Sequence, residues 1–287
     1  MKKKISGTQR TMTMKTTKNQ IDYFEKFYKP NGILKDKKDT RDYFLSVSAE
    51  SAYPTFFRSD SWGKLEVKNQ GRLGSCAGQS GDTAMEDIKG RETNDYSYDF
   101  SPMWLYYRTR EISGMQDRDA GCYLRDICKV LQTQGISLEM LWPYDVNKVF
   151  INPSIISNVF ARLFRIDSYY RCYNIVDIKE ALTSGYSVIG GWEIFSSFYD
   201  AAGTGKVPMP ISTDISRGGH AMWIGGWDDN RQELAIQNSW GKTFGDEGRV
   251  YIPYEYTVKY AYDIWALRPK GSNPAKSALI KALRLWR

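Results

Sequence analysis

The chain has 287 residues, of which 41% are hydrophobic and 25% are charged, which is ordinary for a globular protein and enough for one large domain or two lobes. No apolar run is long enough to span a bilayer, and no apolar stretch follows the basic start, so we expect neither a transmembrane segment nor a secretory signal. The expected location is therefore the cytoplasm or a virus particle.

The net charge of +7 lies at the two ends of the chain. Residues 1–20 and 268–287 each hold six basic residues and no acidic one, whereas the rest carries 28 basic and 33 acidic residues, about −5. This distribution excludes a basic face on the body of the fold as the source of the high pI. An acidic partner, a nucleic acid or a membrane surface is thus a candidate partner for the tails alone.

Both ends differ in composition from the body. Residues 1–54 are interpreted as a basic, partly disordered extension, in which a stretch rich in Tyr and Phe at 21–28 favours a short helix that packs on the body. Residues 269–287 form a basic tail whose apolar positions favour an amphipathic helix. That helix docks either on the body itself or on a membrane surface or acidic partner.

The body changes its pattern along the chain. Between residues 75 and 170, apolar residues recur at helical intervals after Cys76, after Ser101-Pro102 and before Gly135. From about residue 168, short β-type runs alternate with Gly, Asp and Asn turns, at 187–190, 221–224, 233–237 and 249–252. A helical half followed by a β half predicts an α+β protein with a cleft between two lobes.

His220 is the single histidine of the chain, so imidazole chemistry must use it. Zinc sites built on two or three histidines are excluded. The four cysteines make no C-x-x-C pair and are expected to be reduced thiols: Cys76, Cys122, Cys128 and Cys172. No motif supports a metal or an organic cofactor.

The segment around His220 has the pattern of a β-hairpin, with two apolar runs joined by Asp228-Asp-Asn230. If the turn centres on Asp229, His220 and Asn238 are equidistant from it and face each other across the strands. The amide oxygen of Asn238 would then hold one ring nitrogen and leave the other for a nucleophile.

Cys76 is the candidate nucleophile. It follows the glycine-rich turn from Gln70 to Ser75 and precedes a predicted helix. A cysteine at a helix N-terminus lies at the positive end of the helix dipole, where free N–H groups favour the thiolate. The same N–H groups, with the Gln70 side-chain amide, can stabilise an oxyanion.

Three blocks in chain order, Gln70-Gly-x-x-Gly-Ser-Cys76, Gly219-His220-Ala and Asn238-Ser-Trp-Gly241, resemble the signature blocks of papain-like cysteine peptidases. The resemblance covers about residues 55–267 and is closer to the bacterial and viral branch of the family. It implies one domain over 55–268, with a helical lobe at about 66–167 and an antiparallel β-barrel-like lobe at about 168–268.

The resemblance also implies the roles of the site residues. Cys76 is the nucleophile, His220 the general base and acid, Asn238 its orienting partner and Gln70 part of the oxyanion hole. On the substrate-binding side, the same resemblance assigns Gly121, Cys122 and Trp240, the last of which shields the bond between histidine and asparagine from water. The implied reaction is hydrolysis of a peptide bond through an acyl-thioester.

The sequence departs from the family at several points. Leu73 stands where many secreted members have a disulfide-forming cysteine, and Ala77 replaces the Trp that follows the nucleophile. The roughly fifty residues before Pro54 are expected to be too few for the long inhibitory propeptide of the family. Two alternatives therefore stay open. One is a Cys-His acyltransferase or peptide ligase, and the other is an inactive papain-like module with a structural or binding role, for example in a virus particle.

Overall fold

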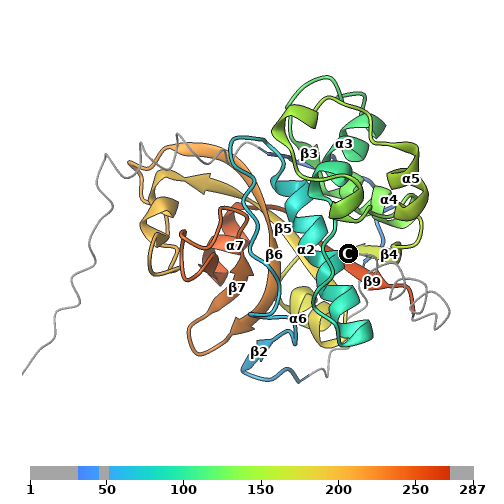
Figure 1. Ribbon diagram of the computed structural model, residues 1–287. Helices are drawn as coiled ribbons and strands as arrows, with labels where there is room; N and C mark the ends of the chain where they lie inside the picture. Colours follow the sequence, from blue (N-terminus) through green and yellow to red (C-terminus); the bar gives the residue numbers. More distant parts are fainter. Residues whose placement is uncertain (1–31, 45–51, 272–287) are drawn as a thin grey trace, which may run out of the picture.

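The structure is a computed structural model that describes residues 32–44 and 52–271 (Figure 1). The helices expected at 21–28 and 278–286 fall outside these residues. No helix in the described part of the chain is both long and apolar enough to cross a membrane. The architecture is α+β, with helices gathered on one side of the molecule and a mostly antiparallel sheet on the other.

The helical half contains the helices that the sequence predicts, together with a short one that it did not. Their bounds are α2 (Cys76–Thr93), α3 (Pro102–Ile112), α4 (Leu124–Thr133) and α5 (Ile155–Ala161), with 3₁₀ turns η1 (Glu139–Leu141) and η2 (Val146–Lys148). The Ser101 side chain caps α3 by accepting a hydrogen bond from the Trp104 N–H. Gly135, with φ of +89°, follows α4 in a left-handed conformation that favours glycine.

The β half contains the four predicted strands within a larger sheet. Its elements are β2 (Phe56–Arg58), β4 (Ile166–Arg171), β5 (Ser187–Phe195), β6 (Ser216–Asp228), β7 (Glu233–Gln237), β8 (Arg249–Pro253) and β9 (Ala261–Pro269), with α6 (Ile175–Thr183), η3 (Ser196–Ala201) and α7 (Tyr254–Tyr260). The strand order is β4-β9-β5-β6-β7-β8, and β2 also pairs with β6. The expected barrel-like lobe is wrong in one respect. Among the described residues the two end strands of this order, β4 and β8, do not pair with each other, so the sheet stays open.

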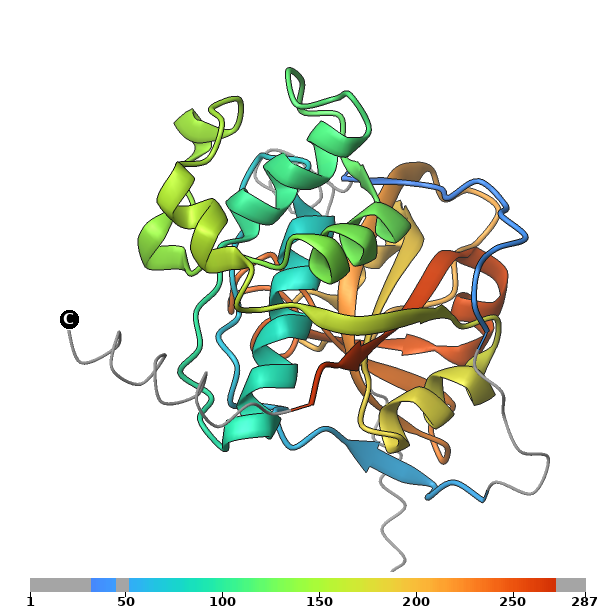
Figure 2. The same ribbon diagram turned by 90° about the vertical axis from the view of Figure 1, so that its right-hand side faces the viewer.

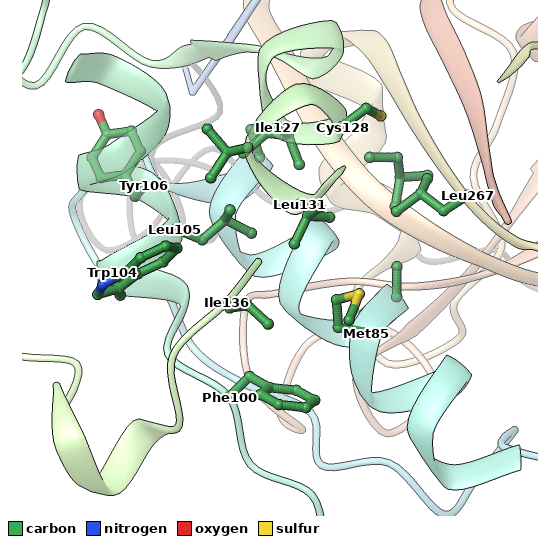
Figure 3. Close-up of a cluster of buried hydrophobic side chains, with 14 of the residues drawn as sticks. Met85, Phe100, Trp104, Leu105, Tyr106, Ile127, Cys128, Leu131, Ile136 and Leu267 are labelled. Carbon is green, nitrogen blue, oxygen red and sulfur yellow. The ribbon is translucent and has the colours of Figure 1, made fainter. Parts of the chain in front are cut away.

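Helix α2 lies between helices α3 and α4 and the sheet, and its residues from Cys76 to Gly90 are buried (Figures 1 and 2). Side chains from α2, α3 and α4 form one core, which Figure 3 shows together with Leu267 of β9. A second core fills the β half and includes Trp192, Trp227 and Trp240. Because α2 contacts both halves, its first residue lies where they meet.

Residues 32–44, hereafter the strap, belong to the N-terminal extension and lie against both halves. Two of its residues form β1 (Ile33–Leu34), which pairs in parallel with β3 (Cys122–Tyr123). In Figure 2 the strap, drawn in blue, runs from the upper end of α2 and then down the outside of the sheet half. At its other end Phe44 pairs with Arg171. This short segment therefore spans the junction of the two halves.

Candidate active site

His220 lies on β6, Asn238 directly follows β7, and a side-chain hydrogen bond joins them, with 2.7 Å between Nε2 and Oδ1. The strand register differs from the expected one, because Trp223 pairs with Gln237 and one residue bulges out of β6. The turn therefore lies beyond Asp229, and His220 is a diagonal rather than a direct partner of Asn238. The two side chains still meet because positions two residues apart on a strand share a face.

Trp240 lies over the His220 ring, with ring centroids 4.7 Å apart. The indole is completely buried and also packs against Phe198 and Phe244, so it stands behind the imidazole rather than on an exposed binding surface. Burial lowers the pKa of His220 to about 4, against the opposing effect of the hydrogen bond with Asn238. The imidazole is then neutral at pH 7. Its Nδ1 has no hydrogen-bond partner among the described residues.

Cys76 is the first residue of α2 and is completely buried. Burial raises the pKa of its thiol to about 12, while backbone N–H groups of Ala221, Ala77, Cys76 itself and Gly32 oppose this rise. Ala221 directly follows His220 on β6, so the thiol lies beside the strand that carries the imidazole. With the strap in place, both groups are held in their neutral forms.

The loop that carries Gln70 is tied to the segment that follows Asn238. The Gln70 N–H donates to the Ser239 carbonyl at 2.9 Å, and the Ser239 hydroxyl donates to Oε1 of Gln70 at 2.7 Å. Nε2 of Gln70 donates to the Leu73 carbonyl at 2.9 Å, within the loop that leads to Cys76. All three sequence blocks therefore meet at the junction of the two halves.

Two further residues hold the loop before Cys76, and the sequence reasoning did not assign them to the site. The Tyr144 hydroxyl lies 2.7 Å from the Ser75 hydroxyl and donates to the Gln70 carbonyl at 2.8 Å. Asp119 accepts a hydrogen bond of 2.9 Å from the Gly74 N–H. Tyr144 ends the run Trp142-Pro-Tyr144, which is a recognisable signal in the sequence. No spacing in the sequence links Asp119 to this loop.

Gly121 and Cys122 lie along the edge where the strap enters. The Cys122 N–H donates to the Gly32 carbonyl at 3.1 Å, and the Gly32 N–H donates to the Gly219 carbonyl at 3.2 Å. The strap is thus hydrogen-bonded to β3 on one side and β6 on the other. The edge expected to bind substrate is occupied by the chain itself.

The strap also covers the nucleophile. A Cβ atom added to Gly32 would lie 2.4 Å from Sγ of Cys76 and 2.6 Å from the Gly74 carbonyl oxygen. Glycine is therefore required at this close approach. Its role had no signal in the sequence, where Pro30-Asn31-Gly32 reads as an ordinary turn.

Metal ligands do not gather in the described part of the chain, where no three His, Cys, Asp or Glu side chains are placed to hold an ion. The four cysteines are all free and buried. The arrangement that remains is a thiol, an imidazole oriented by an amide and a set of backbone donors.

Known proteins share this fold. The chain is 30% identical over 217 residues to the uncharacterized peptidase C1-like protein L477 of Acanthamoeba polyphaga mimivirus, which covers 71% of this chain and 70% of that protein. The crystal structure of xylellain, a cysteine protease from Xylella fastidiosa, matches with a TM-score of 0.77 and 27% identity over 84% of this chain and 97% of that one. Procathepsin B S9 from Trypanosoma congolense has the same fold, with a TM-score of 0.66 and 14% identity over 85% and 87% of the two chains.

The family model for the papain family of cysteine proteases matches residues 57–264, which include all three sequence blocks. This span is well over half of the chain. The family was expected from the blocks around Cys76, His220 and Asn238, and the match confirms it. The chain belongs to the papain family of cysteine proteases.

Proposed function

We propose that the chain is a cysteine endopeptidase that hydrolyses peptide bonds through an acyl-thioester on Cys76. Membership of a family of cysteine proteases supports a hydrolase that acts on peptides or proteins. The observation that carries the proposal is the 2.7 Å bond between His220 Nε2 and Asn238 Oδ1, which leaves Nδ1 without a partner among the described residues. An imidazole held at one nitrogen and open at the other is suited to proton transfer.

In the proposed acylation step, Nδ1 of His220 takes the proton of the Cys76 thiol, and the sulfur attacks the carbonyl carbon of the substrate. The electron pair of the C=O bond moves onto oxygen, where the Cys76 N–H and the Gln70 side-chain amide stabilise the negative charge. When the C=O bond reforms, the C–N bond breaks and the imidazolium gives its proton to the leaving amine. The product is the acyl-thioester.

In the proposed second step, water replaces the amine. His220 Nδ1 takes a proton from the water while the water oxygen attacks the thioester carbon. The Cys76 N–H and the Gln70 side-chain amide stabilise this second oxyanion as well. Collapse breaks the C–S bond, releases the carboxylic acid and returns the proton to the thiolate. Asn238 keeps the imidazole in one tautomer throughout, and Trp240 keeps water from competing for their hydrogen bond.

The test is a peptide-library cleavage profile, with products identified by mass spectrometry. Because the strap covers Cys76, the assay uses the full chain carrying Gly32→Ala and Asp42→Asn. The first change places a methyl group against Sγ, and the second removes the buried strap carboxylate that pairs with Arg125 and Arg171 of the body. We expect cleavage that disappears when Cys76→Ala or His220→Ala is added. Alkylation of Cys76 in a separate aliquot of the same preparation reports whether the site is open, so rapid alkylation there without any cleavage in the untreated aliquot would contradict the proposal.

A further inference from the structure

We propose that a cavity in the helical half binds a phosphate group. The cavity has a volume of about 520 Å³, which is within the range of cavities that hold a small organic ligand. Its walls come from α3, from the end of α4 and from α5 with the turn that follows it. None of the residues placed in the candidate active site lines it, so this site is independent of the proposed peptidase chemistry.

The charge of the lining points to an anion. Arg108, Arg162 and Arg165 line the cavity, and no carboxylate of the described chain does. A guanidinium group presents its N–H donors as a planar fork, which matches two oxygens of a phosphate or carboxylate. Three guanidinium groups around one space favour an anion with more than one negative charge. A phosphate monoester carries about −1.5 to −2 at pH 7, whereas a single carboxylate carries one charge.

Arg108 is held in place without a ligand. Its Nε donates to Oε1 of Gln134 at 2.9 Å, and its Nη1 lies 2.8 Å from Oε2 of Glu111. The guanidinium carbon lies 5.9 Å from the centroid of the Trp104 ring, and the Trp104 indole donates to Oδ1 of Asn158 at 2.8 Å. These contacts join α3 to α4 and α5, so a ligand meets a wall that is already ordered.

Arg162 and Arg165 flank a residue that is anchored in the core. Phe164 is completely buried and packs edge-on against Phe100, with ring centroids 4.8 Å apart. This packing fixes the backbone between the two arginines. Neither guanidinium makes an ion pair or a hydrogen bond with another residue of the described chain, so the donors of both remain for a ligand.

Two helix ends account for only part of this positive charge. Thr133, the last residue of α4, and Arg162, which follows α5, both line the cavity, and a cation is favourable at the carbonyl end of a helix. Each such end carries about half an elementary charge, so the two ends together offset about one arginine. Glu111 offsets a second. A net positive charge is left for a ligand to neutralise.

The phosphate group can belong to a soluble molecule or to a lipid headgroup, and α5 offers a way to distinguish them. This helix lies on the outside of the helical half and exposes three aliphatic side chains, those of Ile155, Ile156 and Val159 (Figure 1). Exposed apolar side chains beside basic ones are typical of proteins that bind a membrane surface. A lipid phosphate would bring a bilayer against these side chains, whereas a soluble phosphate would leave them in water.

The first experiment measures the binding of phenyl phosphate to the full-length protein by isothermal titration calorimetry, with benzoate as the matched carboxylate. We expect benzoate to bind at least about tenfold more weakly than phenyl phosphate, because it carries less charge and fewer acceptor oxygens. In the double variant Arg162→Gln, Arg165→Gln, the Kd for phenyl phosphate is expected to rise at least about tenfold.

Arg231→Gln is the matched control. Arg231 lies in the turn between β6 and β7, its side chain is 62% exposed, and it does not line the cavity. We expect this variant to bind phenyl phosphate with the Kd of the wild type. Because both ends of the chain are basic, the control separates a built site from a general attraction of anions to the protein.

The second experiment measures sedimentation of the same proteins with vesicles of phosphatidylcholine, with or without phosphatidic acid. If the phosphate belongs to a lipid, the double variant and Ile155→Asn both bind vesicles that contain phosphatidic acid at least about tenfold more weakly than Arg231→Gln does. If it belongs to a soluble molecule, these three variants sediment equally, and only the double variant loses phenyl phosphate.

Three results would overturn the proposal. The first is that the double variant equals Arg231→Gln both with phenyl phosphate and with vesicles. The second is that benzoate binds the wild type as tightly as phenyl phosphate does. The third is that the double variant unfolds at a lower temperature than the wild type but keeps its affinity in both experiments, which would mean that the arginines only compensate the helix ends.

Discussion

The Cys76 side and the His220 side of the candidate site are completed by different kinds of structure. His220 is enclosed by parts of the body, namely the Asn238 side chain and the Trp240 indole. Cys76 is enclosed on one side by the strap, which is joined to the body by hydrogen bonds and by the ion pairs of Asp42 with Arg125 and Arg171. The base is therefore oriented permanently, whereas the surroundings of the nucleophile can change without rebuilding a core.

The two pKa shifts follow the same division. Burial lowers the pKa of His220 to about 4 and raises that of Cys76 to about 12, so the closed site holds a neutral pair. When the strap leaves, water reaches the thiol, while the backbone N–H groups at the start of α2 remain to stabilise a thiolate. Opening of the strap would thus change both access to Cys76 and its protonation.

The largest effect is expected from Trp240→Ala, which tests the packing around His220. We expect the free energy of unfolding to fall by about 3–5 kcal/mol, because truncating a buried aromatic residue leaves a cavity. Urea denaturation measures the loss, with Ile155→Ala as a control because that side chain is 81% exposed. A loss no larger than that of the control would mean that the packing around His220 is not a stable part of the body.

Asn238→Ala tests whether the orientation of the base matters when the strap is open. In the Gly32→Ala, Asp42→Asn background we expect the peptide-cleavage rate to fall on the order of 10²-fold, because the imidazole loses the acceptor that selects its tautomer. Asn230→Ala, in the exposed turn of the same hairpin, serves as the control. Unchanged cleavage in Asn238→Ala would remove this residue from the proposed mechanism.

A smaller effect on stability is expected from the titration of Asp36, which lies on the strap. Burial and the neighbouring Asp263 raise its pKa to about 7, although Trp265, Arg125 and Arg171 act in the opposite direction. The native state then binds this proton more tightly than the unfolded chain. Its stabilising effect is complete below about pH 4 and is lost as the pH rises to 7.

Asp36→Asn removes this titration. We expect the free energy of unfolding of the wild type, relative to the variant, to fall by about 2 kcal/mol between about pH 5.5 and about pH 7.5. The contribution of His220 is common to both proteins and cancels. The difference between the wild type and Asp39→Asn should stay flat over this range, because Arg41 holds the pKa of Asp39 below its usual range. An equally flat difference between the wild type and Asp36→Asn would contradict a raised pKa of Asp36 in the native state.

Local chemistry made the elements around the site predictable. A capping serine and a proline mark the start of α3, a glycine follows the end of α4, and a glycine-rich turn precedes Cys76. The pairing of His220 with Asn238 was also foreseen, but its register was not. The bulge in β6 shifts every position beyond it, and no residue in the hairpin sequence announces where a bulge will form.

By itself the sequence determined the family, the helical and β halves and the side chains of the candidate site, since each of these depends on motifs or on spacing within one segment. Only the tertiary structure decided that the sheet stays open and that the strap covers Cys76. Those outcomes depend on contacts between distant segments, such as Asp36 with Asp263 and Gly32 with Cys76. Their energies come from packing and buried charge, which no local pattern encodes.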